Sequence, residues 1–157
     1  MKIKLLTIGK TDSKSLQLLI NEYCKRLGFY ISFSMDMIPD IKNSKNLTNK
    51  QQKIAEGKEL LKRIEKSDAV ILLDENGKLY NSVQFSAFLQ KKMNSGLKKI
   101  IFIIGGPYGF SDEIYEHCDE KVSLSPMTFS HQMVRLFFTE QLYRSFTILR
   151  NEPYHHH

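Results

Sequence analysis

The chain has 157 residues, the size of one ordinary domain, so we expect a single domain over residues 1–157 and no cleft between two large domains. Apolar residues make up 41% and charged residues 25% of the sequence, which excludes global disorder and permits a packed core. The formal net charge of +6 favours an anionic partner such as nucleic acid, although many small basic proteins bind none.

The sequence predicts neither a membrane segment nor a metal site. No apolar run approaches the roughly 20 residues that span a bilayer, and Met1 leads directly into a strand-like segment without the apolar core of a signal peptide. Cys24 and Cys118 lie far apart and have no His at ligand spacing. We therefore expect a cytoplasmic protein with reduced cysteines, no metal and no membrane partner.

The first part of the chain predicts strand, helix and strand. The apolar run 2–8, stopped by Gly9, indicates a strand, and apolar residues at helical spacing indicate a helix over 16–27. Alternation over 30–38 indicates a second strand, which Pro39 ends.

A polar stretch follows, from Asp40 to Lys53, and predicts a mobile basic loop that runs into a helix. Apolar periodicity resumes at Ile54 and indicates a helix that ends near Ser67. The loop either contacts RNA or is simply solvated. Its basic residues are Lys42, Lys45, Lys50 and Lys53.

The remainder predicts the centre of a parallel sheet. Residues 69–73 and 100–104 are continuous apolar runs, as expected for strands covered on both faces. Between them, a helix starts at Ser82 and closes at Ser95-Gly96, and a short strand over 122–124 precedes a long amphipathic segment from about Ser130 to Leu149. This order predicts an α/β fold with helices on both faces of a parallel sheet.

Three segments directly follow predicted buried strands, where ligands collect in open α/β sheets: residues 73–77, 105–109 and 123–128. Gly105, Gly106 and Gly109 let a backbone approach a ligand closely, or simply make a tight turn. The sequence has no Gly-x-Gly-x-x-Gly after the first strand and no Gly-Lys-Ser/Thr. The usual dinucleotide and triphosphate sites are therefore not predicted.

Several motifs taken together resemble one known family. They are Ile103-Ile104-Gly105-Gly106-Pro107-x-Gly109, Ser123-Leu124-Ser125-x-Met127-Thr128-Phe129-x-His131, Val134-Arg135, Glu140-Gln141-Leu142-Tyr143-Arg144 and Pro153-Tyr154-His155. Over essentially its whole length the chain resembles the bacterial methyltransferases of the SPOUT superfamily that modify N3 of a pseudouridine in large-subunit (23S) rRNA. The resemblance implies a parallel sheet, a C-terminal trefoil knot, a homodimer, S-adenosylmethionine bound in the knot, and 23S rRNA within the assembled ribosome as the partner.

The resemblance also implies which residues bind the cofactor. S-adenosylmethionine has no phosphates, so it needs an apolar slot for adenine and backbone hydrogen bonds instead of a basic cradle. Without the resemblance, the same positions are equally well explained as core and turn residues. The cofactor-binding residues are expected to be Leu73, Gly105, Leu124, Ser125, Pro126, Met127, Thr128 and Phe129.

Methyl transfer to N3 needs a base or an anion stabiliser, and the candidates are His131, beside the proposed cofactor loop, and Arg135, four residues on and on the same helical face. The resemblance places Arg144, Tyr154 and His155 in the RNA-facing catalytic region. A guanidinium can hold a phosphate bidentately, and an aromatic ring can stack on a base. By itself, a His at the start of a helix is more often a cap or a surface residue. Glu140 and Arg144 lie four residues apart, and a surface ion pair is the default explanation of that spacing.

A dimer is also expected from the last helical segment, which has more apolar surface than one sheet face covers, unless a core helix uses all of it. Its apolar residues are Val134, Phe137, Phe138, Leu142 and Phe146. Tyr108 departs from the family pattern, which often has an acidic residue there. No role is assigned to His156 and His157.

Two other functions stay open. A basic ribosome-associated binding module could share the fold without catalysing a reaction, and it would bind no S-adenosylmethionine. A small nucleotide hydrolase on the same kind of sheet is disfavoured by the missing phosphate loop.

Overall fold

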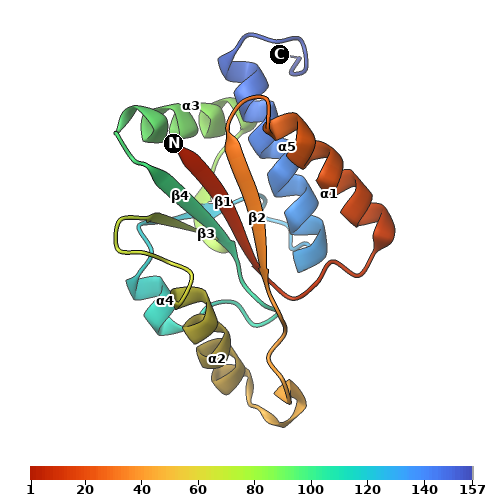
Figure 1. Ribbon diagram of the computed structural model, residues 1–157, viewed down its shortest axis with the longest axis vertical. Coiled ribbons are helices and arrows are strands. Elements are labelled where there is room, and N and C mark those ends of the chain that lie inside the picture. The colour runs from red at the N-terminus through yellow and green to blue at the C-terminus, as the bar shows by residue number, and fades with distance from the viewer. Residues whose placement is uncertain (157) are drawn as a thin grey trace.

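The computed structural model describes residues 1–156, and His157 lies outside them. Within that range five parallel strands form one sheet in the order β2-β1-β4-β3-β5 (Figure 1). The prediction of a parallel α/β sheet is confirmed. The strands are β1 (Lys2–Ile8), β2 (Ser32–Ile38), β3 (Ala69–Leu79), β4 (Lys99–Ile104) and β5 (Glu120–Ser123).

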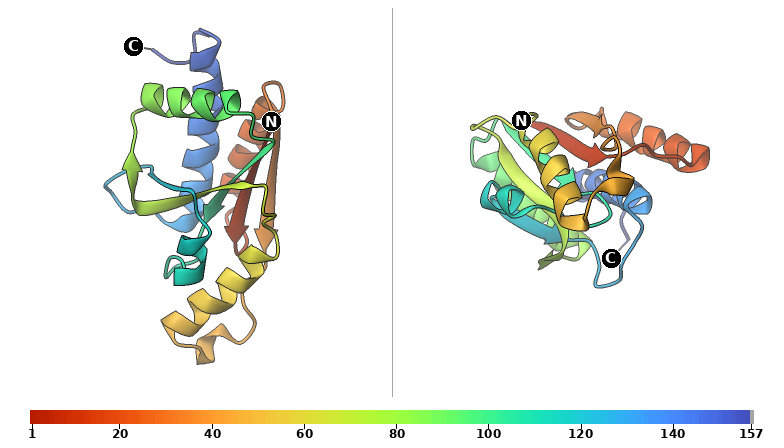
Figure 2. Two further views of the ribbon diagram at one scale, coloured as in Figure 1. Left: turned by 90° about the vertical axis from the view of Figure 1, so that its left-hand side faces the viewer. Right: turned by 90° about the horizontal axis from the view of Figure 1, so that it is seen from below.

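Helices cover both faces of this sheet (Figures 1 and 2). One face carries α1 (Lys14–Leu27), α3 (Ser82–Asn94) and α5 (His131–Leu149), and α5 packs against both of the others. The other face carries α2 (Asn49–Leu61) and the short α4 (Asp112–Glu116), with the 3-10 turn η1 (Ser44–Asn46) just before α2.

The central strands explain why the core has two parts. Successive side chains of a strand point to opposite faces, so a continuous apolar run fills both layers at once. In β4, Ile100 and Phe102 belong to the cluster under α1, α3 and α5, whereas Ile101 and Ile103 belong to the cluster under α2 and α4. The rings of Phe102 and Phe138 lie 4.7 Å apart and join the sheet to α5.

Helix α2 begins five residues earlier than the apolar pattern predicted. Thr48 caps it: the Thr48 side chain accepts a hydrogen bond from the backbone N–H of Gln51, and the Gln51 side chain accepts one from the backbone N–H of Thr48. This capping box supplies partners for two N–H groups that would otherwise have none. Residues 49–53 are therefore helical, and the predicted basic loop is correspondingly shorter. Similarly, α3 is capped by Asn81 and not by Ser82.

Strand β3 continues beyond its apolar run to Leu79. It pairs with β5 on both sides of an irregularity between Leu73 and Lys78. A Cβ at Gly77 would lie 2.6 Å from the backbone nitrogen of Val122, so only glycine permits this approach of the two backbones. Residues 74–77 therefore form the irregular part of β3, and pairing with β5 resumes at Lys78, beyond the end of the apolar run.

Helix α5 extends from the carboxyl edge of the sheet to the far end of the molecule (Figure 1). Its 19 residues correspond to about 28 Å. Its first residue, His131, consequently lies near the carboxyl edge of the sheet, and Leu149 lies at the other end of the helix. None of the helices in the described part of the chain has the length and apolar character needed to cross a bilayer.

Candidate functional site

A cleft of about 570 Å³ lies at the carboxyl edge of the sheet. Its walls come from β3 and the segments that follow β4 and β5, which are the places the sequence predicted. Seven of the eight expected cofactor-binding residues line it; Pro126 lies in the same loop but is not among the lining residues. The seven are Leu73, Gly105, Leu124, Ser125, Met127, Thr128 and Phe129.

The glycine-containing wall is supported from behind by two side chains. A Cβ at Gly105 would meet the ring of Phe110 at 3.0 Å, and a Cβ at Gly106 would meet the Glu56 carboxylate at 2.4 Å. The turn closes with a hydrogen bond from the N–H of Gly109 to the carbonyl of Gly106, 3.1 Å long. Gly105 thus leaves room for Phe110, and a bulkier residue there would displace the cleft wall.

The segment after β5 forms an apolar rim. Ser125 holds its turn, because the Ser125 hydroxyl accepts a hydrogen bond of 2.9 Å from the N–H of Met127. Met127 is 71% exposed, and Phe129 packs on Phe137 with ring centroids 4.9 Å apart. Phe129 and Phe137 also line a second hollow of about 440 Å³ on the other side of this segment.

The charged side chains of the cleft are acidic. Asp74 and Glu75 line it, whereas its lining contains no Lys or Arg. The hydroxyl of Tyr115 donates to Asp74 Oδ2 over 2.6 Å, and the N–H of Asn76 donates to Asp74 Oδ1 over 2.8 Å. Burial, together with Asp74, raises the pKa of Tyr115. This arrangement suits a positively charged ligand without phosphates better than a nucleotide.

His131 lines the same cleft, but Arg135 does not. Arg135 is 1% exposed. Its Nη2 donates to the carbonyl of Ile8 over 2.6 Å, its Nη1 donates to the hydroxyl of Thr11 over 2.8 Å, and burial lowers its pKa. Arg135 therefore ties α5 to the end of β1.

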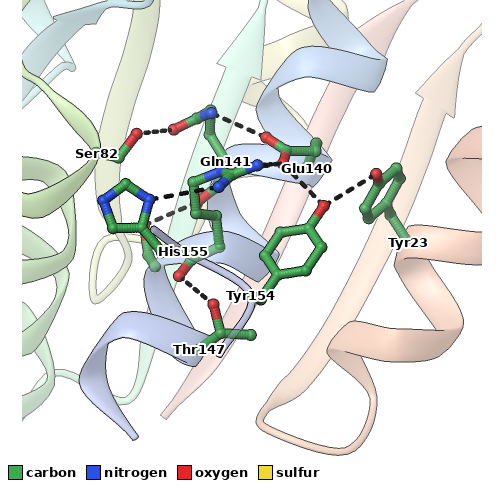
Figure 3. Close-up of polar contacts among 9 residues, drawn as sticks. Tyr23, Ser82, Glu140, Gln141, Thr147, Tyr154 and His155 are labelled. Atoms are coloured by element: carbon green, nitrogen blue, oxygen red, sulfur yellow. Dashed lines mark hydrogen bonds and ion pairs between the residues drawn. The ribbon is translucent and has the colours of Figure 1, made fainter. Parts of the chain in front are cut away.

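Tyr154 and His155 lie against the C-terminal half of α5 (Figure 3), where they contact Glu140 and Arg144. Nη2 of Arg144 donates to Glu140 over 2.5 Å, and Nη1 of Arg144 lies 3.3 Å from Nδ1 of His155. Tyr154 donates to the same Glu140 oxygen over 3.0 Å, and its ring lies 4.6 Å from the Arg144 guanidinium. Burial and hydrogen bonds to Tyr23 and Glu140 raise the pKa of Tyr154.

The C-terminal tail is also fixed to α1 and to the turn that follows it. The hydroxyls of Tyr23 and Tyr154 lie 3.2 Å apart. The hydroxyl of Tyr30 donates to Glu152, which raises the pKa of Tyr30 to about 12. The tail is thus an ordered part of the fold.

The expected site residues therefore form two groups within one chain. His131 and Arg144 lie thirteen residues apart on α5, about 20 Å along the helix axis. The cofactor residues surround His131 at one end, and the tail group surrounds Arg144 at the other.

The residue-by-residue expectations missed several side chains of the cleft. Tyr115 comes from α4, whose five residues are too short to show a helical pattern. Phe110 and Val122 resemble core residues in sequence, and only the three-dimensional arrangement shows that they line the cleft. Other lining residues outside the expected set are Asp74, Glu75, Asn76, Ile104, Gly106, Pro107, Tyr108, Gly109, Ser123, Ser130 and Val134. No cluster of His, Cys, Asp or Glu that could hold a metal occurs among residues 1–156.

Comparison with known proteins gives a consistent result. The family model described as a predicted SPOUT methyltransferase matches residues 1–155. Proteins named ribosomal RNA large subunit methyltransferase H are 67% identical in Flavobacterium johnsoniae, 62% in Christiangramia forsetii and 56% in Porphyromonas gingivalis; each alignment covers 99% of both chains. The SpoU methyltransferase AviRb from Streptomyces viridochromogenes, solved with AdoMet, is 14% identical with a TM-score of 0.47, covering 96% of this chain and 59% of AviRb. That structural likeness is too low to support an inference.

Glu56 provides a test of how the cleft wall is supported. It is 3% exposed; Oε1 accepts a hydrogen bond from Gln52, and Oε2 has no partner among the described residues. Burial raises its pKa, so its contribution to stability is present in acid and is lost as the pH rises through that raised pKa.

We expect Glu56→Gln to be more stable than the parent at pH 8 by on the order of 1 kcal/mol. The reason is that glutamine removes the buried negative charge of the Glu56 carboxylate, whose Oε2 has no hydrogen-bond partner among the described residues. The difference should shrink towards pH 4. Urea unfolding of both proteins at the two pH values measures it. A variant less stable than the parent at pH 8 would show that the carboxylate has a favourable partner.

Proposed function

Because this chain belongs to the SPOUT methyltransferase family, we propose that it transfers a methyl group from S-adenosylmethionine to N3 of a pseudouridine in 23S rRNA. It acts in the cytoplasm as one domain, on the assembled ribosome. The observation that carries the proposal is the cleft, where three segments distant in sequence meet without a single Lys or Arg. The names of the relatives at 67% and 62% identity, aligned over 99% of their length, support rRNA as the substrate.

The cleft fits the cofactor in size and chemistry. About 570 Å³ lies within the range of small-molecule sites. Leu73, Leu124 and Phe129 offer apolar surface for adenine, and the backbone of Gly105 can be approached closely. Pro126 shapes the same loop as Ser125 and Thr128. When bound, S-adenosylmethionine supplies the methyl group carried by its sulfonium sulfur, and the carboxylates of Asp74 and Glu75 favour the positive charge of that sulfur.

The protein's tasks are alignment of the two reactants and removal of the proton from N3. His131 lies at the cleft wall and is our candidate for holding that proton or stabilising the resulting anion. Arg144 is held by Glu140 and stacked on Tyr154, so its guanidinium is oriented to bind a phosphate or a base. Tyr154 and His155 position the target base. Arg135 acts through α5, whose first turn it holds in place.

The separation of the two groups supports a homodimer. About 20 Å of α5 lies between His131 and Arg144, and neither Arg144, Tyr154 nor His155 lines the cleft of its own chain. A two-fold pair can place the tail of one subunit at the cleft of the other. Phe138, Leu142 and Phe146 are buried in the core, so the apolar surface left for the partner is smaller than the sequence suggested. It includes Met127, Phe129 and Phe137.

The trefoil knot is part of the proposal because of the family alone. In the proposed knot, residues 122–130 and then α5 pass through a loop formed by an earlier part of the chain. The cofactor cleft would then be part of the knot. Threading is rare among folds, so topology by itself would not predict it.

The direct test uses ribosomes from a bacterial strain that lacks this gene. Purified protein and S-adenosylmethionine should add one methyl group to large-subunit rRNA, and mass spectrometry should locate it on N3 of a pseudouridine. Calorimetry should detect S-adenosylmethionine binding. Protein that binds no cofactor would instead be the non-enzymatic binding module, and phosphate release from nucleoside triphosphates would indicate a hydrolase.

Deletion of residues 153–157 separates cofactor binding from methyl transfer. We expect S-adenosylmethionine affinity to persist, because the three cleft segments come earlier in the chain, and methyl transfer to fall by about 100-fold or more, because the target base loses its positioning. Tyr154→Phe is the matched variant. It keeps the ring over Arg144 and removes the hydrogen bonds to Glu140 and Tyr23, so it should lose less methyl-transfer activity than the truncated protein. Unchanged methyl transfer by the truncated protein would remove Tyr154 and His155 from the site.

Mixed dimers test whether two chains share one site. Gly105→Val should prevent cofactor binding by moving Phe110 and the cleft wall, and Arg144→Ala should disable the tail group; each homodimer should be inactive. Mixed dimers, purified through a different tag on each subunit, should recover about half of the parental activity, because one of their two sites is intact. Inactive mixed dimers would place both groups in one subunit, and a monomer mass in light scattering would exclude the dimer.

A further inference from the structure

Most of the excess positive charge of the protein lies in one short segment. Residues 41–53 contain four lysines and no acidic residue, so they contribute +4 to the formal net charge of +6. The other residues carry 19 basic and 17 acidic side chains, a balance of only +2. We call residues 41–53 the basic arm.

The lysines of the basic arm have no counterions in the fold. Lys42, Lys45 and Lys50 are exposed and Lys53 is half-buried, and none of the four forms an ion pair with any described residue. By contrast, Lys4, Lys62, Lys92 and Lys99 are all paired with carboxylates.

The two carboxylates that flank the basic arm are directed at the protein. That of Asp40 lies against Gly9, and that of Glu56 lies against Gly106 in the cleft wall. They are therefore poorly placed to neutralise the lysines. The first turn of α2 also lacks an acidic residue, so the positive end of the helix dipole adds to the field of Lys50 and Lys53.

The basic arm lies beyond the same edge of the sheet as the cleft. It follows the carboxyl end of β2, and η1 with the first turn of α2 projects past the ends of the strands (Figures 1 and 2). Along α2, Lys50 precedes Glu56 by six residues, which is about 9 Å. Glu56 supports the glycine wall of the cleft, so Lys50 and Lys53 lie close to the place where methyl transfer is proposed, and Lys42 and Lys45 precede them in the basic arm.

We propose that the basic arm holds backbone phosphates of rRNA beside the cofactor cleft, and so increases affinity for the ribosome without taking part in cofactor binding or methyl transfer. The inference rests on the proposed function, because it assumes an RNA substrate. Lysine is a point charge without the planar fork of arginine, and an array of lysines suits phosphates instead of base edges. The arm therefore positions the protein on RNA and does not read sequence.

The test replaces the four lysines by glutamine, as Lys42→Gln, Lys45→Gln, Lys50→Gln and Lys53→Gln in one protein. Glutamine has nearly the helix propensity of lysine, and the Thr48–Gln51 capping box is untouched. The matched control is Lys25→Gln, Lys66→Gln, Lys91→Gln and Lys98→Gln, which removes the same charge from four exposed lysines elsewhere. Ribosome binding is measured by sedimentation across a salt series, with S-adenosylmethionine affinity and thermal unfolding as checks of the fold.

We expect the arm variant to bind ribosomes at least about tenfold more weakly, and the magnitude of the slope of log K against log salt to fall by about 3, since each of the four phosphate contacts contributes about 0.7 to 0.9. KM for methyl transfer to ribosomes should rise, with kcat and cofactor affinity unchanged. The control variant should stay near the parent. An arm variant with the parental slope, or a control that weakens equally, would overturn the inference; a parent that binds ribosomes without methylating them would instead overturn the proposed function.

Discussion

Parallel pairing brings the carboxyl ends of β3, β4 and β5 to one edge of the sheet, because strands that run in the same direction also end on the same side. The cleft exists only because the three segments that follow these strands meet there. Each wall then needs support from behind: Phe110 and Glu56 fill the space that Gly105 and Gly106 leave free, and Tyr115 holds Asp74. The layer of α2 and α4 therefore shapes a site to which α2 contributes no lining residue.

Sequence patterns predicted the parts of the structure in which one physical effect dominates. The apolar runs 69–73 and 100–104 indicated buried strands, and the segments that follow the predicted strands therefore marked the place of the cleft. Prediction failed where contacts between residues distant in sequence determine the local structure. The continuation of β3 through polar residues depends on pairing with β5, and the capping box at Thr48 outweighed the lack of apolar periodicity in residues 49–53. Arg135 occurs four residues after His131, yet its burial depends on Ile8 and Thr11, which no local pattern indicates.

Charge is distributed in a way that separates the tasks of the protein. The cleft has carboxylates and no Lys or Arg, as a sulfonium ligand would favour. The basic arm next to it carries unpaired lysines, whereas the tail group holds an arginine already oriented by Glu140. A diffuse cationic surface attracts RNA from a distance, and an oriented guanidinium acts only on contact. Methyl donor, RNA backbone and target base would then be recognised by three different kinds of surface.

The clamp between Arg135 and the carbonyl of Ile8 joins residues 127 positions apart, and Tyr30 and Glu152 join residues 122 positions apart. A chain synthesised from its N-terminus cannot make either bond until nearly all of it has left the ribosome. Until then the apolar strands β1 and β4 lack the helix that covers one of their faces. Contacts of such long sequence separation slow folding, and exposed strands are prone to aggregate while it proceeds. The late position of α5 in the sequence thus makes completion of the fold a late event, which has to wait until this helix has been synthesised.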